Sequence, residues 1–103
     1  MAMQRANDEQ IAQFLRGHPA WTLAAGKLHR EYRFKDFVQA FGFMAQAALV
    51  AERSDHHPEW FNVYSRVVVD LTTHDAQGVS ARDFALALAM DAIAASIGAA
   101  PNP

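Results

Sequence analysis

The chain has 103 residues, enough for one compact domain, and it contains no cysteine, which excludes disulfide scaffolds, thiolate metal sites and cysteine nucleophiles. Hydrophobic residues make up 51% and charged residues 19%, so the composition is that of a folded chain rather than a disordered one. Nine basic and eleven acidic residues give a net charge of −2, which argues against direct binding of nucleic acid through charge.

We expect neither a membrane span nor a targeting segment. Residues 1–8 lack the apolar run of a signal peptide. The most apolar stretch, residues 84–100, consists mostly of alanine and is interrupted by Asp91, so it is too short and too weakly hydrophobic to cross a bilayer. A cytoplasmic location fits these features.

The hydrophobic pattern predicts the order helix, two strands, helix, two strands, helix. Capping boxes open the first helix, at Asn7 and Gln10, and the last, at Ser80 and Asp83. The expected strands are residues 21–23, 27–34, 60–64 and 67–73, and the longest expected helix is 36–53. This order indicates an α+β fold in which helices cover one face of a four-stranded antiparallel sheet. We expect a single domain over residues 1–103, with its core at about 8–97 and a frayed tail at 101–103.

Periodicity also predicts which side chains face the core. The expected strand positions are Leu28, Tyr32 and Phe34, together with Val67, Val69 and Leu71 on one face of the last strand. The expected helix stripes are Phe37, Phe41, Met44, Ala48 and Leu49, then Phe84, Leu88, Ala92 and Ala95. Gly42 is expected to allow close packing of its helix against the sheet.

Three of the five histidines lie at element boundaries, where chemistry tends to sit. His56 and His57 occupy a break before a strand, and His74 follows the end of another. Pro58 holds His57 in an extended conformation, so the two neighbouring rings should point in different directions. The polar residues around these histidines are Asp55, Glu59, Thr72, Thr73 and Asp75.

Three interpretations of these histidines stay open on the residues alone. They could be loop histidines with local hydrogen bonds. They could form a three-histidine metal site, although adjacent histidines have poor geometry for one ion and the helical i, i+4 spacing is missing. They could perform general acid–base catalysis without a metal, since imidazole exchanges protons near neutral pH.

The segment Asp55-His56-His57-Pro58-Glu59-Trp60-Phe61-Asn62-Val63-Tyr64 resembles the pterin-4a-carbinolamine dehydratases. The resemblance continues upstream through residues 34–37 and 40–44, and downstream through Thr73-His74, which stands 18 residues after His56, and residues 80–83. It covers about residues 8–97.

This resemblance implies the same α+β fold and a hydro-lyase activity, that of a 4a-hydroxytetrahydrobiopterin dehydratase that yields quinonoid dihydropterin in tetrahydropterin recycling. It implies that His56, His57 and His74 are the active-site histidines, with His56 and His74 as the acid–base pair and His57 mainly positioning the substrate. It further implies that Asp55, Thr72, Thr73 and Asp75 line the pterin site and that no metal or redox cofactor is needed.

The resemblance also implies partners. An aromatic amino acid hydroxylase would supply the substrate, and the chain would form a homo-oligomer, a dimer or a tetramer. The alanine-rich last helix and the strand edges are the expected contact surfaces. The alternative function, known for animal members, is that of a protein-binding module that serves as a dimerisation cofactor for a transcription factor.

Overall fold

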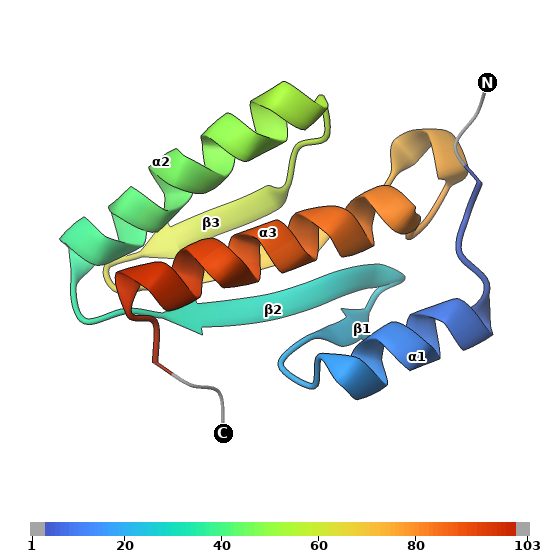
Figure 1. The fold of residues 1–103 in the computed structure, drawn as a ribbon, viewed down its shortest axis with the longest axis horizontal. Helices are drawn as coiled ribbons and strands as arrows, with labels where there is room; N and C mark the ends of the chain where they lie inside the picture. The colour runs from blue at the N-terminus through green and yellow to red at the C-terminus, as the bar shows by residue number, and fades with distance from the viewer. Residues whose placement is uncertain (1–3, 101–103) are drawn as a thin grey trace.

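A computed structural model describes residues 4–100 and confirms the predicted order of elements (Figure 1). The expected tail, 101–103, lies outside this range. The elements are α1 Asp8–Gly17, β1 Thr22–Ala24, β2 Lys27–Arg33, α2 Phe37–Ser54, β3 Glu59–Val63, β4 Arg66–Leu71, the 3-10 turn η1 His74–Ala76, and α3 Ala81–Ile97. Within the described part of the chain, no helix is both long and apolar enough to span a bilayer.

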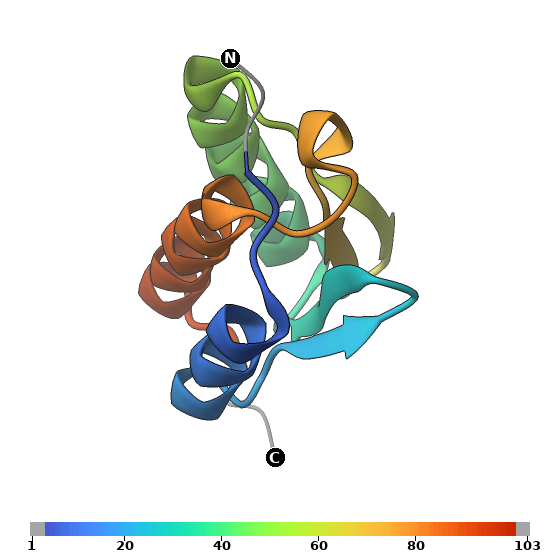
Figure 2. The same ribbon diagram turned by 90° about the vertical axis from the view of Figure 1, so that its right-hand side faces the viewer.

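The four strands form an antiparallel sheet in the order β1-β2-β4-β3. Both hairpins are tight, and the β1–β2 turn places Ala25 and Gly26 at positive φ, as a two-residue hairpin turn requires. All three helices lie on the same side of the sheet (Figure 2), as predicted. Among residues 4–100, no helix lies on the other face of the sheet (Figure 2).

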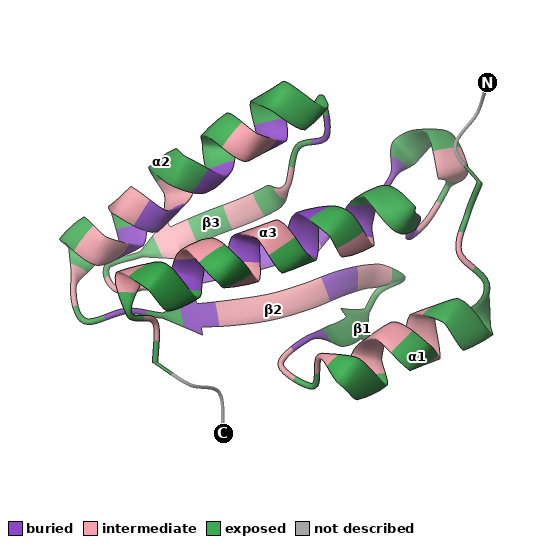
Figure 3. Cartoon of the chain, viewed as in Figure 1, coloured by how far each residue is buried: buried purple, intermediate pink, exposed green. Residues whose placement is uncertain are grey.

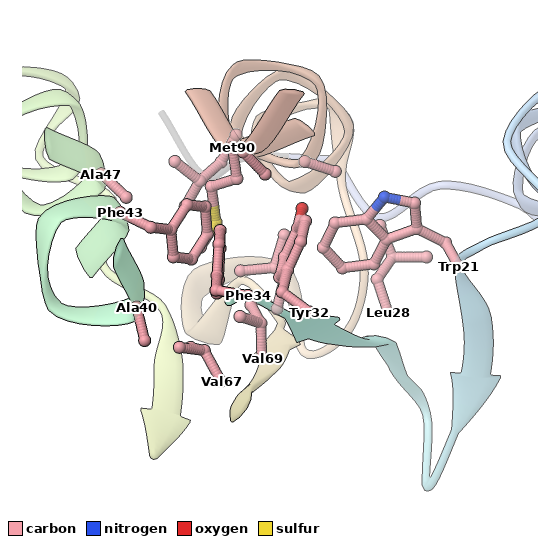
Figure 4. Close-up of a cluster of buried hydrophobic side chains, with 14 of the residues drawn as sticks. Trp21, Leu28, Tyr32, Phe34, Ala40, Phe43, Ala47, Val67, Val69 and Met90 are labelled. Carbon is pink, nitrogen blue, oxygen red and sulfur yellow. The ribbon is translucent and has the colours of Figure 1, made fainter. Parts of the chain in front are cut away.

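The period-two pattern of the two central strands builds the floor of the core. Leu28 pairs with Leu71 and Tyr32 pairs with Val67, and these four side chains are fully buried. Phe34 and Val69 are buried beside them, so every core position predicted for the strands is confirmed. Tyr32, Phe34 and Phe43 form an aromatic group at the centre, with ring centroids 4.7–6.3 Å apart (Figure 4).

Two polar residues that interrupt apolar patterns, Arg30 and Asp91, form an ion pair with each other. Arg30 shares the inward parity of Leu28 and Tyr32, and Asp91 interrupts the apolar face of α3. In the structure Arg30 Nη1 donates to Asp91 Oδ1 at 2.7 Å, and the same carboxylate accepts from Trp21 Nε1 and from the Tyr32 hydroxyl. Burial raises the pKa of the Tyr32 phenol, and the Asp91 carboxylate raises it further, so the phenol remains a donor. This cluster ties α3 to the hairpin β1–β2.

The core stripe predicted for α2 is wrong, because most of its residues lie on the outer face of the helix. Phe37, Phe41 and Leu49 are 48–73% exposed and Ala48 is exposed, whereas Met44 is half-buried. The buried side of α2 carries Ala40, Phe43, Ala47 and Ala51 (Figure 3). Three of these four side chains are alanine, and a prediction based on hydrophobic size alone misidentified the inner face. Gly42 does not serve close packing, because a Cβ atom there would meet nothing within 4 Å.

The stripe predicted for α3 is wrong for the same kind of reason. The buried residues are Asp83, Leu86, Ala87, Met90 and Ala94. Leu88, Ala92 and Ala95 are exposed, and Phe84 is half-buried against Phe14, with ring centroids 4.7 Å apart. The inner face is set by Asp83, a fully buried carboxylate that a hydrophobic pattern places on the outside.

Replacing Asp91 should destabilise the protein. We expect Asp91→Ala to lower the free energy of unfolding by about 2–4 kcal/mol, because three donors lose their common acceptor in a largely buried place. Urea denaturation followed by circular dichroism measures the change. Asp8→Ala, at an exposed position in the first turn of α1, is the control and should cost less than about 1 kcal/mol. Equal losses in the two variants would contradict this role for Asp91.

Candidate active site

A cavity of about 370 Å³ opens at the end of the molecule where α2 ends and α3 begins. We call it the histidine cavity. Its walls come from the segment between α2 and β3, from the end of β4 with η1, and from the first turn of α3 (Figure 1). The lining residues are Asp55, His56, His57, Pro58, Glu59, Thr72, Thr73, His74, Asp75 and Arg82. Its volume lies in the range of ordinary small-molecule sites, roughly 300–1,000 Å³.

The end of α2 turns His56 into this cavity. Asp55 adopts the left-handed conformation (φ 51°, ψ 42°), which aspartate tolerates better than most residues. Its N–H donates to Glu52 O, and the N–H of His56 donates to Ala51 O. This pair of bonds is a Schellman motif, which ends the helix and reverses the chain. His56 is therefore buried, while His57, one residue further on, is exposed, so the two rings diverge as expected.

A buried carboxylate fixes the ring of His56. Its Nε2 lies 2.6 Å from Asp83 Oδ1, and Asp83 is fully buried. Because a carboxylate can only accept, Nε2 carries the hydrogen and Nδ1 of the neutral ring keeps the lone pair. The second oxygen, Oδ2, accepts from the Thr73 hydroxyl at 2.8 Å and from Ser80 N–H at 2.9 Å. The Ser80 hydroxyl lies 2.6 Å from Thr73 Oγ1, so the four groups form one hydrogen-bonded unit.

The other two histidines sit at the surface of the cavity. His57 Nε2 lies 2.8 Å from Glu52 Oε1, and both side chains are mainly exposed. His74 begins η1 in a loop closed by two backbone hydrogen bonds between Thr73 and Gly78. The cavity thus presents one fixed, shielded imidazole and two imidazoles in contact with water.

All seven residues singled out from the sequence line this one cavity: Asp55, His56, His57, Thr72, Thr73, His74 and Asp75. The remaining two histidines lie elsewhere. His18 stacks on Phe14, and His29 Nδ1 lies 2.8 Å from Asp70 Oδ1 on the open face of the sheet. Within residues 4–100, no three histidine, aspartate or glutamate side chains are grouped closely enough to hold a metal ion.

Sequence reasoning missed the supporting residues. The sequence predicts Asp83 only as a helix cap, and it assigns no role in a site to Glu52, Arg82 or Ser80. A signal was present for Asp83, because its cap geometry needs only one carboxylate oxygen and leaves the other for a second partner. Only the fold shows that this partner is His56, 27 residues away in the chain.

Two further hollows flank the β1–β2 turn. One, of about 390 Å³, is lined by Ala25, Gly26, Lys27, Thr72, Thr73, His74, Gln77 and Gly78, and we call it the side hollow. The other, of about 540 Å³, lies against the segment before α1 and is lined by residues such as Arg5, Asn7 and Ile11. The second hollow is larger than the histidine cavity but has no histidine in its lining. Three of the five histidines, His56, His57 and His74, therefore line the histidine cavity, and His74 also borders the side hollow.

Asp83 should be needed for the stability of this site. We expect Asp83→Asn to lower the free energy of unfolding by about 2–4 kcal/mol, because an amide NH₂ would face one of the donors that the carboxylate now accepts from. Chemical denaturation measures the loss. Asp70→Asn is a matched control, since it also weakens an Asp–His pair but in a half-exposed position, and should cost less than about 1 kcal/mol. Similar losses of unfolding free energy in both variants would show that the buried network stabilises the fold no more than the half-exposed Asp–His pair does.

Comparison with known proteins identifies relatives along nearly the whole chain. The profile of the family described as pterin 4 alpha carbinolamine dehydratase matches residues 4–93. A protein of Solibacter usitatus is 58% identical over 91 residues, covering 88% of this chain and 96% of its own, and one of Rhodopseudomonas palustris is 56% identical over 97 residues, covering 92% and 96%. Both names assign the relatives provisionally as pterin-4-alpha-carbinolamine dehydratases.

A solved structure shares the fold. It is described as a transcriptional coactivator/pterin dehydratase from Brucella melitensis, with a TM-score of 0.85 and 48% identity. The match covers 88% of this chain and 99% of that one.

Proposed function

The chain belongs to the pterin-4a-carbinolamine dehydratase family, and from this premise we propose that it is a hydro-lyase that dehydrates 4a-hydroxytetrahydropterin to quinonoid dihydropterin. The observation that carries the proposal is the gathering of three imidazoles from two separate loops around one cavity, with one of them fixed by a buried carboxylate. The proposal includes a cytoplasmic location and a functional link to an aromatic amino acid hydroxylase, which would generate the substrate.

The reaction needs an acid and a base near two adjacent atoms. The C4a–O bond breaks and the hydroxyl leaves as water after it receives a proton. The N5 proton is removed, and the N5 electron pair forms the C4a=N5 double bond. Two histidines at one cavity could perform both transfers near neutral pH, since imidazole serves as either acid or base there.

We assign His56 to the leaving hydroxyl and His74 to N5. The ring of His56 is held by Asp83 through Nε2–H, so Nδ1 is the atom left to serve the substrate. It would deliver the proton from the doubly protonated ring, whose positive charge the Asp83 carboxylate offsets, and the ring returns to the neutral form with the lone pair on Nδ1. His74 is exposed, so it can release the N5 proton to water. His57 would position the substrate with support from Glu52.

The polar lining suits the other edge of a pterin. The pyrimidine ring presents N–H donors at N3 and at the 2-amino group, and Asp55 and Asp75 bring carboxylate acceptors to the cavity. Thr72 and Thr73 complete the wall contributed by β4. These four residues are our candidates for substrate binding.

Substitution of the cavity histidines tests the proposal. A hydroxylase generates 4a-hydroxytetrahydropterin in situ, and absorbance follows its decay with and without the protein. We expect the wild type to accelerate the decay, and His56→Ala and His74→Ala each to reduce that acceleration by about 10²-fold or more, the usual contribution of one acid–base group.

His18→Ala and His29→Ala are matched controls, because both remove an imidazole outside the cavity. They should retain activity, and treatment with a chelator should leave the wild-type rate unchanged. Failure of the wild type to accelerate the decay would end the proposal. Loss of activity on chelation would instead favour a metal mechanism.

We also propose that a second copy of this chain covers the outer face of α2. This face exposes Phe37, Val38, Phe41 and Leu49, which are 48–77% accessible (Figure 3). Residues 37–51 of the helix contain no charged side chain, whereas a helix that faces water normally carries several. The last helix, which the sequence suggested as a contact surface, exposes only one large apolar side chain, Leu88, among those described.

Charge placed on this face should dissociate the oligomer. We expect the wild type to be a dimer or tetramer by light scattering, and Phe41→Glu to shift it to a smaller species, because the carboxylate would be buried without a partner. Leu88→Glu is the matched control and should leave the mass unchanged. A monomeric wild type, or dissociation by Leu88→Glu alone, would contradict the assignment.

The alternative function, binding of a transcription factor, draws on the description of the Brucella melitensis structure as a coactivator and on the same face of α2. A partner bound through α2 by a chain without dehydratase activity would favour this alternative.

A further inference from the structure

The side hollow shares its inner wall with the histidine cavity. Thr72, Thr73 and His74 line both spaces. Beyond this wall the side hollow is bounded by the β1–β2 turn, residues 25–27, and by Gln77 and Gly78 at the far side of the closed loop. The two spaces together therefore form a site with two compartments, with His74 at their boundary.

The chemistry of a pterin gives this second compartment an occupant. The reacting atoms are C4a and N5, and C6, which carries the side chain, is bonded directly to N5. A histidine that takes the N5 proton therefore stands beside the point where the side chain leaves the ring. We propose that the side hollow receives the substituent at C6 and that Gln77 is a specificity-determining residue for it. This inference rests on the proposed dehydratase function and on the assignment of His74 to N5.

The lining favours an uncharged, hydroxylated substituent over a carboxylated one. The charged residue in the lining of the side hollow is Lys27, whereas three carboxylates, Asp55, Glu59 and Asp75, and the cation Arg82 line the adjoining histidine cavity. Lys27 Nζ is already paired with Glu59 Oε1 at 2.6 Å, and this bond raises the pKa of the Lys27 ammonium. An anionic tail in the side hollow would therefore meet a cation that is already paired, beside a cavity that carries three carboxylates, whereas a hydroxyl group can exchange hydrogen bonds with the Gln77 amide.

Stable ligands test the location directly. Two 7,8-dihydropterins, one with a 6-methyl group and one with a short hydroxylated chain at C6, are titrated into the isotope-labelled protein. We expect both to shift NMR signals of the histidine cavity, and only the longer ligand to shift the amides of Gly26, Gln77 and Gly78, which do not line that cavity. Identical shifts from both ligands would overturn the inference while leaving the dehydratase proposal intact. Absence of binding by either would overturn both.

Kinetics with the corresponding 4a-carbinolamines test the residue. Gln77→Ala should raise KM for the hydroxylated substrate by about 2- to 10-fold, the loss of one hydrogen bond, with kcat unchanged and with the 6-methyl substrate unaffected. Gln13→Ala, at an exposed position on α1, is the matched control. In the wild type, a carboxylated side chain should lower kcat/KM relative to the hydroxylated one. Equal effects of Gln77→Ala on both substrates, or preference for the carboxylated chain, would contradict the proposal.

Discussion

The carboxylate of Asp83 is the interaction on which the site depends. It is fully buried, and both of its oxygens are engaged, one by His56 and the other by Thr73 and the backbone of Ser80. The partners come from three places, the turn after α2, the end of β4 and the start of α3. A buried carboxylate without these donors would destabilise the folded state by several kcal/mol. The fold is therefore stable only while these three segments stay together. The hydrogen bonds that cap α3 and the hydrogen bond that holds His56 thus belong to one network.

The same hydrogen-bonded unit explains why the three cavity histidines differ in their surroundings. One ring is fixed from behind, whereas His57 and His74 project from a helix end and a small closed loop and are in contact with water. A fixed group suits delivery of a proton to one atom, and exposed groups suit exchange with solvent. The architecture therefore supplies groups of both kinds at one cavity, although the residue type is the same.

Much of the fold could be predicted from the sequence, because strands and helix starts are governed by local rules. Every strand residue that parity assigned to the core is buried, and Asn7 and Ser80 marked helix starts by their caps. The inner faces of α2 and α3 could not be predicted in this way. Those faces combine several alanines and a buried aspartate with only three large apolar residues, Phe43, Leu86 and Met90, and a rule that favours large apolar residues selects the outward side instead. Tertiary packing, which periodicity does not contain, decides between the two faces.

The candidate site divides in a similar way. The residues that line the cavity carry unusual chemistry at element boundaries, and the resemblance of residues 55–64 to a known family pointed to them directly. The supporting residues Asp83 and Ser80 form an ordinary capping box in the sequence, so their second task becomes visible only when residue 56 is placed beside residue 83. Long-range partners of this kind have no local signature.

The alanine-lined contact between α2 and α3 limits how this protein can change over time. The buried alanines of these helices, Ala40, Ala47 and Ala51 in α2 and Ala87 and Ala94 in α3, have no accessible surface or almost none, and Ala40 lies beside Val67 of the sheet (Figure 4). Growth of any of them by two methyl groups would push its helix away from what it packs against, and both helices end or begin at the histidine cavity. Divergence among relatives should therefore be absorbed on the outer faces, so that new partners can be acquired there while the end with the histidine cavity stays the same.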